Sequence, residues 1–143
     1  MNTEKTTGEY MLLFRGQHWD RGLSPHELKA TLDKLTAWFE GLNERGKVKA
    51  SQPLGAQGRI ISGANGGLVV DGPFAESKEA VGGYLVLQAV GLKEAVEIAR
   101  SMPTLKYGLT VEVRPILGEC PTFARHAEVI ERAKDQLWAA AAA

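Results

Sequence analysis

The chain has 143 residues, the usual size of one domain, and a domain of this length buries roughly two thirds of the surface that its unfolded chain exposes. Seventeen basic and seventeen acidic side chains give a formal net charge of zero. The chain therefore lacks the excess of positive charge that is typical of proteins that bind nucleic acid or an anionic membrane. Residues 1–9 lack the apolar stretch of a secretion signal, and no segment approaches the roughly 20 apolar residues of a membrane span. We therefore expect a cytoplasmic protein.

Motifs for metals and cofactors are missing from the sequence. The single cysteine, Cys120, excludes an intramolecular disulfide and a CxxC redox pair, and we interpret it as structural or incidental. The histidines are scattered without the spacing of a metal site. No glycine-rich dinucleotide motif, P-loop or GxSxG nucleophile elbow is present, so we expect neither a metal nor a cofactor.

A strand and a long amphipathic helix come first in the chain. Residues 10–14 form a short apolar run that ends at Arg15-Gly16 and is typical of a buried strand. Ser24 and Glu27 form a capping box, and Gly46 is a C-terminal stop signal. Between them, apolar residues at three- and four-residue spacings predict the buried face of a helix: Leu28, Leu32, Leu35, Trp38, Phe39 and Leu42.

The second half of the pattern resembles the first, with a hairpin between the two halves. Residues 48–54 predict a strand, and residues 59–62 and 68–71 flank an Asn-Gly turn that predicts a β-hairpin. Residues 83–90 predict a further strand. Residues 92–102 predict a helix that Pro103 stops, with Leu92, Ala95, Val96 and Ala99 buried. Alternating residues 109–114 predict the last core strand.

A split β-α-β repeat of this kind folds as a four-stranded antiparallel sheet with both helices on one face. The strands supply apolar residues to both faces, but the chain has only two core helices. A second copy of the chain is therefore the expected cover of the open face, in a homodimer that pairs sheet to sheet.

We divide the chain into a flexible N-terminus of residues 1–9, a domain of residues 10–117 and a helical tail of residues 118–143. The tail is predicted to form a third helix, packed on the domain or on the partner subunit, because apolar residues recur there at roughly helical spacing. The alternative is a partly frayed chain end.

The segment Asp71-Gly72-Pro73-Phe74-Ala75-Glu76-Ser77-Lys78-Glu79, followed by Gly82-Gly83-Tyr84, closely resembles the signature of the DGPF branch of the YCII-related family. Residues 10–13, 107 and 111–115 extend the match to roughly residues 10–115. The resemblance implies a ferredoxin-like fold in a dimeric α/β-barrel assembly. It leaves the activity open: most members have no assigned reaction, some are suspected enzymes that use a histidine and an aspartate, and some occur near or fused to extracytoplasmic-function sigma factors.

Asp71 and His18 are the candidate catalytic residues. Asp71 ends a strand before a Gly-Pro turn, where desolvation would raise the pKa of its carboxyl into the working range of a general acid or base. The alternative is that Asp71 caps the turn. His18 follows the first strand, and a pair with Asp71 or Asp20 would form a proton shuttle near neutral pH. The alternative is an exposed loop histidine.

Strand alternation predicts a set of polar residues on the open face of the sheet. They would ring an amphipathic cavity against the partner subunit and suit a small organic acid or phenol. The alternative is an ion-pair network that cements the dimer. The candidate substrate-binding residues are Arg15, Tyr84, Gln88, Glu112 and Arg114.

Three functional hypotheses follow. The first is a cofactor-independent small-molecule enzyme with isomerase-, lyase- or dehalogenase-like acid–base chemistry. The second is a non-catalytic module that binds a metabolite, or a protein such as a sigma factor in transcription initiation. The third is that the DGPF motif preserves only fold and dimerisation.

Overall fold

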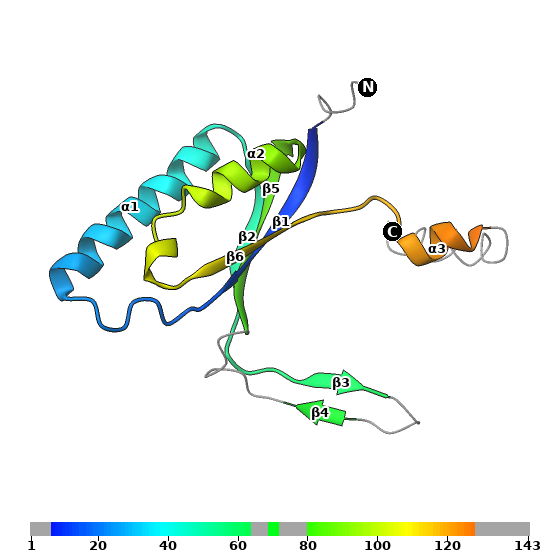
Figure 1. Ribbon diagram of the computed structural model, residues 1–143, viewed down its shortest axis with the longest axis horizontal. Helices are drawn as coiled ribbons and strands as arrows, with labels where there is room; N and C mark the ends of the chain where they lie inside the picture. The colour runs from blue at the N-terminus through cyan, green and yellow to red at the C-terminus, as the bar shows by residue number, and fades with distance from the viewer. Residues whose placement is uncertain (1–6, 64–68, 72–79, 128–143) are drawn as a thin grey trace.

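The computed structural model describes residues 7–63, 69–71 and 80–127, and Figure 1 shows their arrangement. Strands β1 (Thr7–Arg15), β2 (Val48–Pro53), β5 (Val81–Val90) and β6 (Thr110–Pro115) form a four-stranded sheet in the order β2-β5-β1-β6. Each neighbouring pair is antiparallel. Helices α1 (Pro25–Glu44) and α2 (Gly91–Arg100) cover one face of this main sheet (Figure 1). The predicted ferredoxin-like α+β fold is confirmed.

Helix α1 begins and ends as its sequence predicts. The Ser24 hydroxyl accepts a hydrogen bond from the Glu27 N–H, and the Glu27 carboxylate accepts one from the Ser24 N–H, each at 3.1 Å. Gly46 follows the helix with a φ of +70°, which glycine adopts without steric cost. Leu32, however, is exposed, and the neighbouring Thr31 is buried in its place. Consecutive residues are rotated by about 100° around a helix, so with Thr31 on the buried face Leu32 lies outside it.

Helix α2 is held at its start by a carboxylate. Glu94 accepts a hydrogen bond from the Val90 N–H at 2.6 Å and pairs with the Lys47 ammonium at 3.1 Å. The hydrogen bond from Val90, followed by the one from Lys47, lowers the pKa of the Glu94 carboxyl. The predicted burial of Leu92 is wrong, because the contact of α2 with the sheet begins one turn later, at Ala95, and also includes Ile98.

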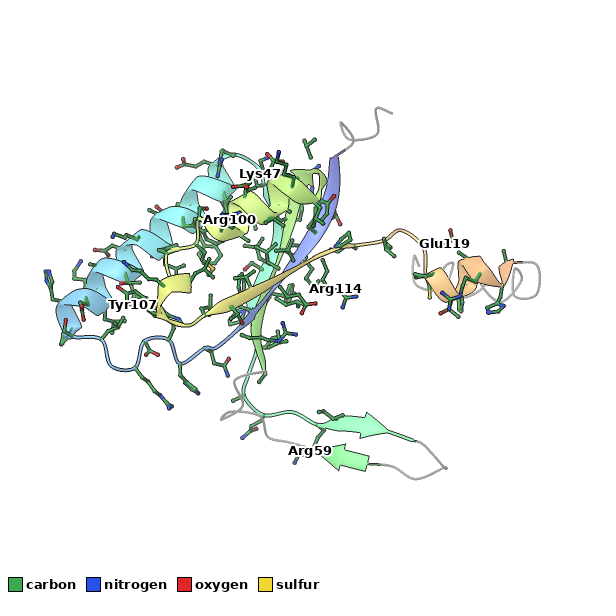
Figure 2. The ribbon with its side chains drawn as sticks, in the orientation of Figure 1. Lys47, Arg59, Arg100, Tyr107, Arg114 and Glu119 are labelled. Atoms are coloured by element: carbon green, nitrogen blue, oxygen red, sulfur yellow. The ribbon has the colours of Figure 1, made fainter. Side chains whose placement is uncertain are left out.

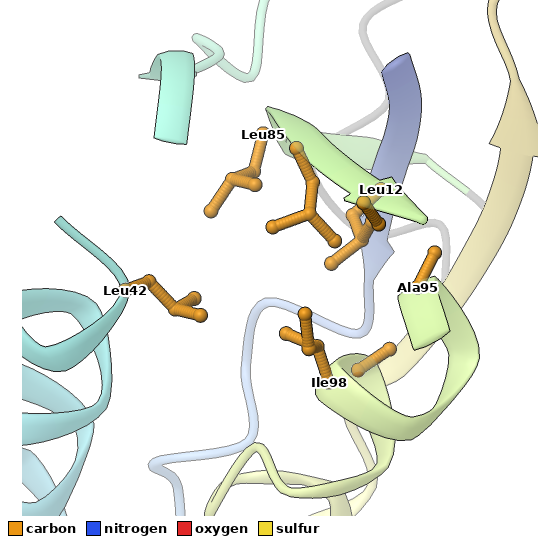
Figure 3. Packing of buried hydrophobic residues seen from close by; sticks show 8 residues of the cluster. Leu12, Leu42, Leu85, Ala95 and Ile98 are labelled. Carbon is orange, nitrogen blue, oxygen red and sulfur yellow. The ribbon is translucent and has the colours of Figure 1, made fainter. Parts of the chain in front are cut away.

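The core lies between the main sheet and the two helices. Leu12 and Leu85 occupy the central strands β1 and β5 and are fully buried, as is Leu42 of α1. Figure 3 shows these side chains converging with Ala95 and Ile98 of α2. This packing fixes which face of each central strand points toward the helices.

The remaining elements lie outside this core. Strands β3 (Ile60–Ser62) and β4 (Val69–Asp71) pair antiparallel and confirm the predicted hairpin, which projects away from the main sheet (Figure 1). A short helix, η3 (Leu105–Tyr107), precedes β6, and helix α3 (Pro121–Arg125) stands apart from the sheet. The rest of the predicted tail helix lies outside the described residues.

Strand β1 begins at Thr7, earlier than the predicted start at Tyr10, because Thr7 to Glu9 continue the ladder against residues 88–90. Within the described ranges, no helix is long and apolar enough to cross a membrane.

Candidate functional site

The strand register sorts the residues of the main sheet onto two faces. Leu12 lies opposite Leu85 and faces the helices, whereas the next pair along the ladder, Leu13 and Tyr84, faces away. The same alternation in β6 places Glu112 opposite Leu13. The predicted shared face is confirmed for the whole set, which is Arg15, Tyr84, Gln88, Glu112 and Arg114. Their role in binding stays a prediction.

Glu112 lies between two arginines on this open face. Its carboxylate pairs with the Arg15 guanidinium at 2.8 Å and lies 3.8 Å from the Nε of Arg114. Figure 2 shows Arg114 projecting away from α1 and α2. An anionic ligand would have to compete with Glu112 for both arginines, so this geometry favours the ion-pair interpretation. Pairs as exposed as these contribute little to stability.

The two candidate catalytic residues lie on different connections. His18 is exposed in the turn after β1, where its carbonyl accepts a hydrogen bond from the Arg21 N–H at 3.1 Å. Asp71 ends β4 opposite Ile60 in the hairpin, and its side chain lies outside the described part of the structure. The predicted His–Asp pair is therefore untested.

A cavity of about 320 Å³ lies on the other side of the sheet, where α1 passes the ends of β1 and β2 and the start of β5. We call it the α1 cavity. Its walls are mainly apolar, and its polar lining residues are Gln17, Ser51, Gln52 and Tyr84. The register points the side chains of Gln52 and Tyr84 to the open face of the sheet, so Gln17 and Ser51 are the polar residues whose side chains can face the cavity. The apolar lining consists of Phe14, Trp19, Leu35, Phe39, Pro53, Met102 and Leu109.

Two glycines at the start of β5 shape the α1 cavity. A Cβ atom on Gly83 would lie 3.2 Å from the Gln52 carbonyl oxygen and 3.8 Å from the Phe14 ring. A Cβ atom on Gly82 would collide with the side-chain oxygen of Gln17. The missing side chains thus let strand β2 and the loop after β1 approach β5 closely. The Gly82-Gly83 pair is the sequence feature that could have indicated this close backbone approach.

Trp19 is held at the α1 cavity by a second aromatic ring. Its indole stacks on Tyr107 of η3 with a centroid separation of 6.4 Å. Figure 2 labels Tyr107 near the start of α1, beside the loop that carries Trp19. Aromatic stacking of this kind adds stability beyond simple burial. The contact fixes one wall of the cavity.

Titratable groups are sparse at the α1 cavity. Its described lining includes one residue with an ionisable side chain, Tyr84, and the strand register points that side chain to the open face. Among residues 7–63, 69–71 and 80–127, no cluster of three or more His, Cys, Asp and Glu side chains could hold a metal ion. Outside the cavity, hydrogen bonds from the Phe123 and Thr122 N–H groups lower the pKa of the Cys120 thiol.

Residues 9–118 match the family model of the YCII-related domain. The chain belongs to the YCII-related family. An uncharacterized protein of Rhizobium meliloti (strain 1021), R00369, is 33% identical over 82 residues. The match covers 54% of this chain and 66% of that protein, just under two thirds of its length. The family predicted from the DGPF motif is confirmed, and it leaves the activity open.

Two solved structures are similar to this YCII-related chain. A complex of 5-chloro-2-hydroxyhydroquinone dehydrochlorinase (TftG) from Burkholderia phenoliruptrix AC1100 with 2,5-dihydroxybenzoquinone has a TM-score of 0.43 and 17% identity, over 78% of this chain and 95% of that one. Hydroxynitrile lyase from Passiflora edulis has a TM-score of 0.36 and 12% identity, over 82% of this chain and 99% of that one. Likeness at this level transfers no activity to this chain.

Proposed function

We propose that this protein binds a small phenol or organic acid in the α1 cavity and transforms it by cofactor-independent acid–base chemistry of the isomerase, lyase or dehalogenase kind. The cavity itself is the observation that supports the proposal. Its volume of about 320 Å³ falls within the roughly 300–1,000 Å³ of small-molecule sites, and it joins apolar walls to a few polar groups. Such a lining suits an aromatic body with one or two oxygen substituents.

The polar lining would orient the ligand and leave the proton transfer to other residues. The Gln17 amide and the Ser51 hydroxyl can exchange hydrogen bonds with a phenol or carboxyl group. Asp71, with His18, is the proposed proton carrier. In sequence, the DGPF motif runs into Gly82 at the cavity, which supports this proposal.

The assembly is proposed to be a homodimer that pairs through the open face of the sheet. Val86 lies on this face beside Met11, and both side chains are half-buried. We expect Val86→Asp to convert the dimer to a monomer in light scattering, because a charge there loses its water at the interface. Exposed Ile61→Asp in the hairpin serves as the control and should leave the mass unchanged. A protein that is monomeric before mutation, or a dimer in both variants, would contradict this assembly.

Ligand binding can be tested with a variant that fills the α1 cavity. A ligand that binds only the native state raises the midpoint of thermal unfolding, so 4-hydroxybenzoate and catechol are suitable first probes. We expect Ser51→Leu to weaken binding at least about tenfold, a change of about 1.4 kcal/mol in binding free energy. Lys49→Leu, in the same strand but outside the lining, should bind normally. Equal affinity in both variants would place the ligand elsewhere.

A non-catalytic role is the alternative function. Arg15 already forms an ion pair with Glu112, and the described lining of the α1 cavity supplies no acid–base pair. These observations favour a module that binds a metabolite, or a protein such as a sigma factor. Product analysis separates the two functions: turnover abolished by Asp71→Asn with binding retained supports the enzyme. Binding without turnover in the unmutated protein supports the module.

A further inference from the structure

A second cavity lies on the helix side of the sheet, between the middle of α1 and the segment that follows α2. It has a volume of about 340 Å³. We call it the cationic cavity, because three basic side chains line it: Lys34 of α1, Arg100 at the end of α2, and Lys106 of η3. Figure 2 shows Arg100 on the side of the sheet that carries the helices. The remaining lining residues are Thr31, Met102, Pro103 and Leu105.

The positive charge is concentrated locally in a chain whose formal net charge is zero. The described lining of the cationic cavity contains no aspartate or glutamate. The three basic residues are exposed, so water and salt screen the repulsion between them. A lining with three cations and no carboxylate suits an anionic ligand.

Nearby acidic groups leave much of this charge uncompensated. Glu97 lies 3.9 Å from the Arg100 guanidinium, and both side chains are exposed, so water and salt screen this pair strongly. Asp33, the neighbour of Lys34 in sequence, pairs instead with Lys29 at 2.9 Å. An incoming anion could thus bind Arg100 without breaking a buried ion pair.

We propose that the cationic cavity binds a small oxyanion with two or more negative charges, of the phosphate-ester or polycarboxylate class. A guanidinium can hold two oxygens of such a group in parallel hydrogen bonds, and the two ammonium groups add point charges. Met102, Pro103 and Leu105 provide an apolar floor for the organic part of the ligand. The site is separate from the α1 cavity and does not depend on the function proposed for it.

The two cavities nevertheless share a wall. Met102 lines both of them, and it is buried. Helix α1 supplies Lys34 to the cationic cavity and the next residue, Leu35, to the α1 cavity. An oxyanion in the cationic cavity would therefore contact the side chain that borders the proposed substrate, so its binding can influence that site.

Titration of the isotope-labelled full chain with inorganic pyrophosphate, followed by NMR at constant ionic strength, tests the proposal. We expect saturable shifts of the backbone amides of Arg100, Met102 and Lys106, and weaker binding when the titration is repeated at a higher ionic strength. Shifts that do not saturate, or that map to another surface, would overturn the proposal.

Charge-matched double variants make this test specific. Lys34→Gln with Lys106→Gln should weaken pyrophosphate binding at least about tenfold, equal to about 1.4 kcal/mol. Lys49→Gln with Lys93→Gln removes the same charge from β2 and α2 outside the cavity and should change affinity less than about twofold. Equal losses in both would mean nonspecific attraction and would refute the site. If the first double variant does not fold, Arg100→Gln gives the same test.

Discussion

Truncation of Leu85 to alanine is expected to lower the free energy of unfolding by about 2–5 kcal/mol, the usual cost of removing a buried leucine side chain from a packed core. Leu85 has 0% exposure and lies in a central strand opposite Leu12, beneath the two helices. The loss has two sources, because the apolar contacts disappear and the surrounding helices close the space only in part. Urea unfolding followed by circular dichroism measures the change.

Leu117→Ala is the matched control for this prediction. Leu117 is 61% exposed after β6, so its truncation should change stability by less than about 0.5 kcal/mol. A loss below about 1 kcal/mol for Leu85→Ala, or an equal loss for both variants, would mean that the core does not lie between the sheet and the helices.

Gly16→Ala is expected to destabilise the protein more than Gly22→Ala, although both glycines have left-handed backbone angles. Their φ values are +83° and +88°, so each alanine carries a backbone cost of about 1–2 kcal/mol. At Gly16 the added Cβ would also lie 2.7 Å from the Gly108 carbonyl oxygen, whereas at Gly22 it meets no atom within 4 Å. Gly16→Ala must therefore separate the end of β1 from the segment before β6.

Comparison of the two glycine variants by urea unfolding isolates the steric contribution, because the conformational contribution is nearly the same in both. The difference between their free energies of unfolding measures how tightly the loop after β1 is held against residue Gly108. Equal destabilisation would show that these two backbone segments are not in contact. That result would also weaken the placement of Gln17 and Trp19 at the α1 cavity.

Most of the fold could be predicted from local patterns, because each element carries its own signals. Ser24 and Glu27 define the start of α1 by hydrogen bonds within one turn. Alternation along β6 assigns its residues to faces without knowledge of the neighbouring strand. Burial at the edge of an element is different: Leu92 and Leu32 have helical spacing, but their exposure depends on how far the sheet extends beneath each helix.

The sites were less predictable, because they depend on contacts between distant segments. Alternation placed Arg15 and Glu112 on one face, but only the three-dimensional arrangement gives their contact at 2.8 Å. The α1 cavity includes Gly82 and Gly83, which the β2 strand and the loop after β1 approach closely, whereas strand alternation pointed to polar residues on the opposite face. The cationic cavity combines side chains from three elements whose spacing in sequence forms no motif.

We propose that the α1 cavity holds the small-molecule ligand of this YCII-related protein. Intermolecular nuclear Overhauser effects between bound 4-hydroxybenzoate and the labelled protein test it most directly. We predict contacts from the aromatic protons of the ligand to Leu35 and Phe39 of α1 and to Met102. Contacts confined to Leu13 and Val86, on the opposite face of the sheet, would contradict the claim and place the ligand at the proposed dimer interface.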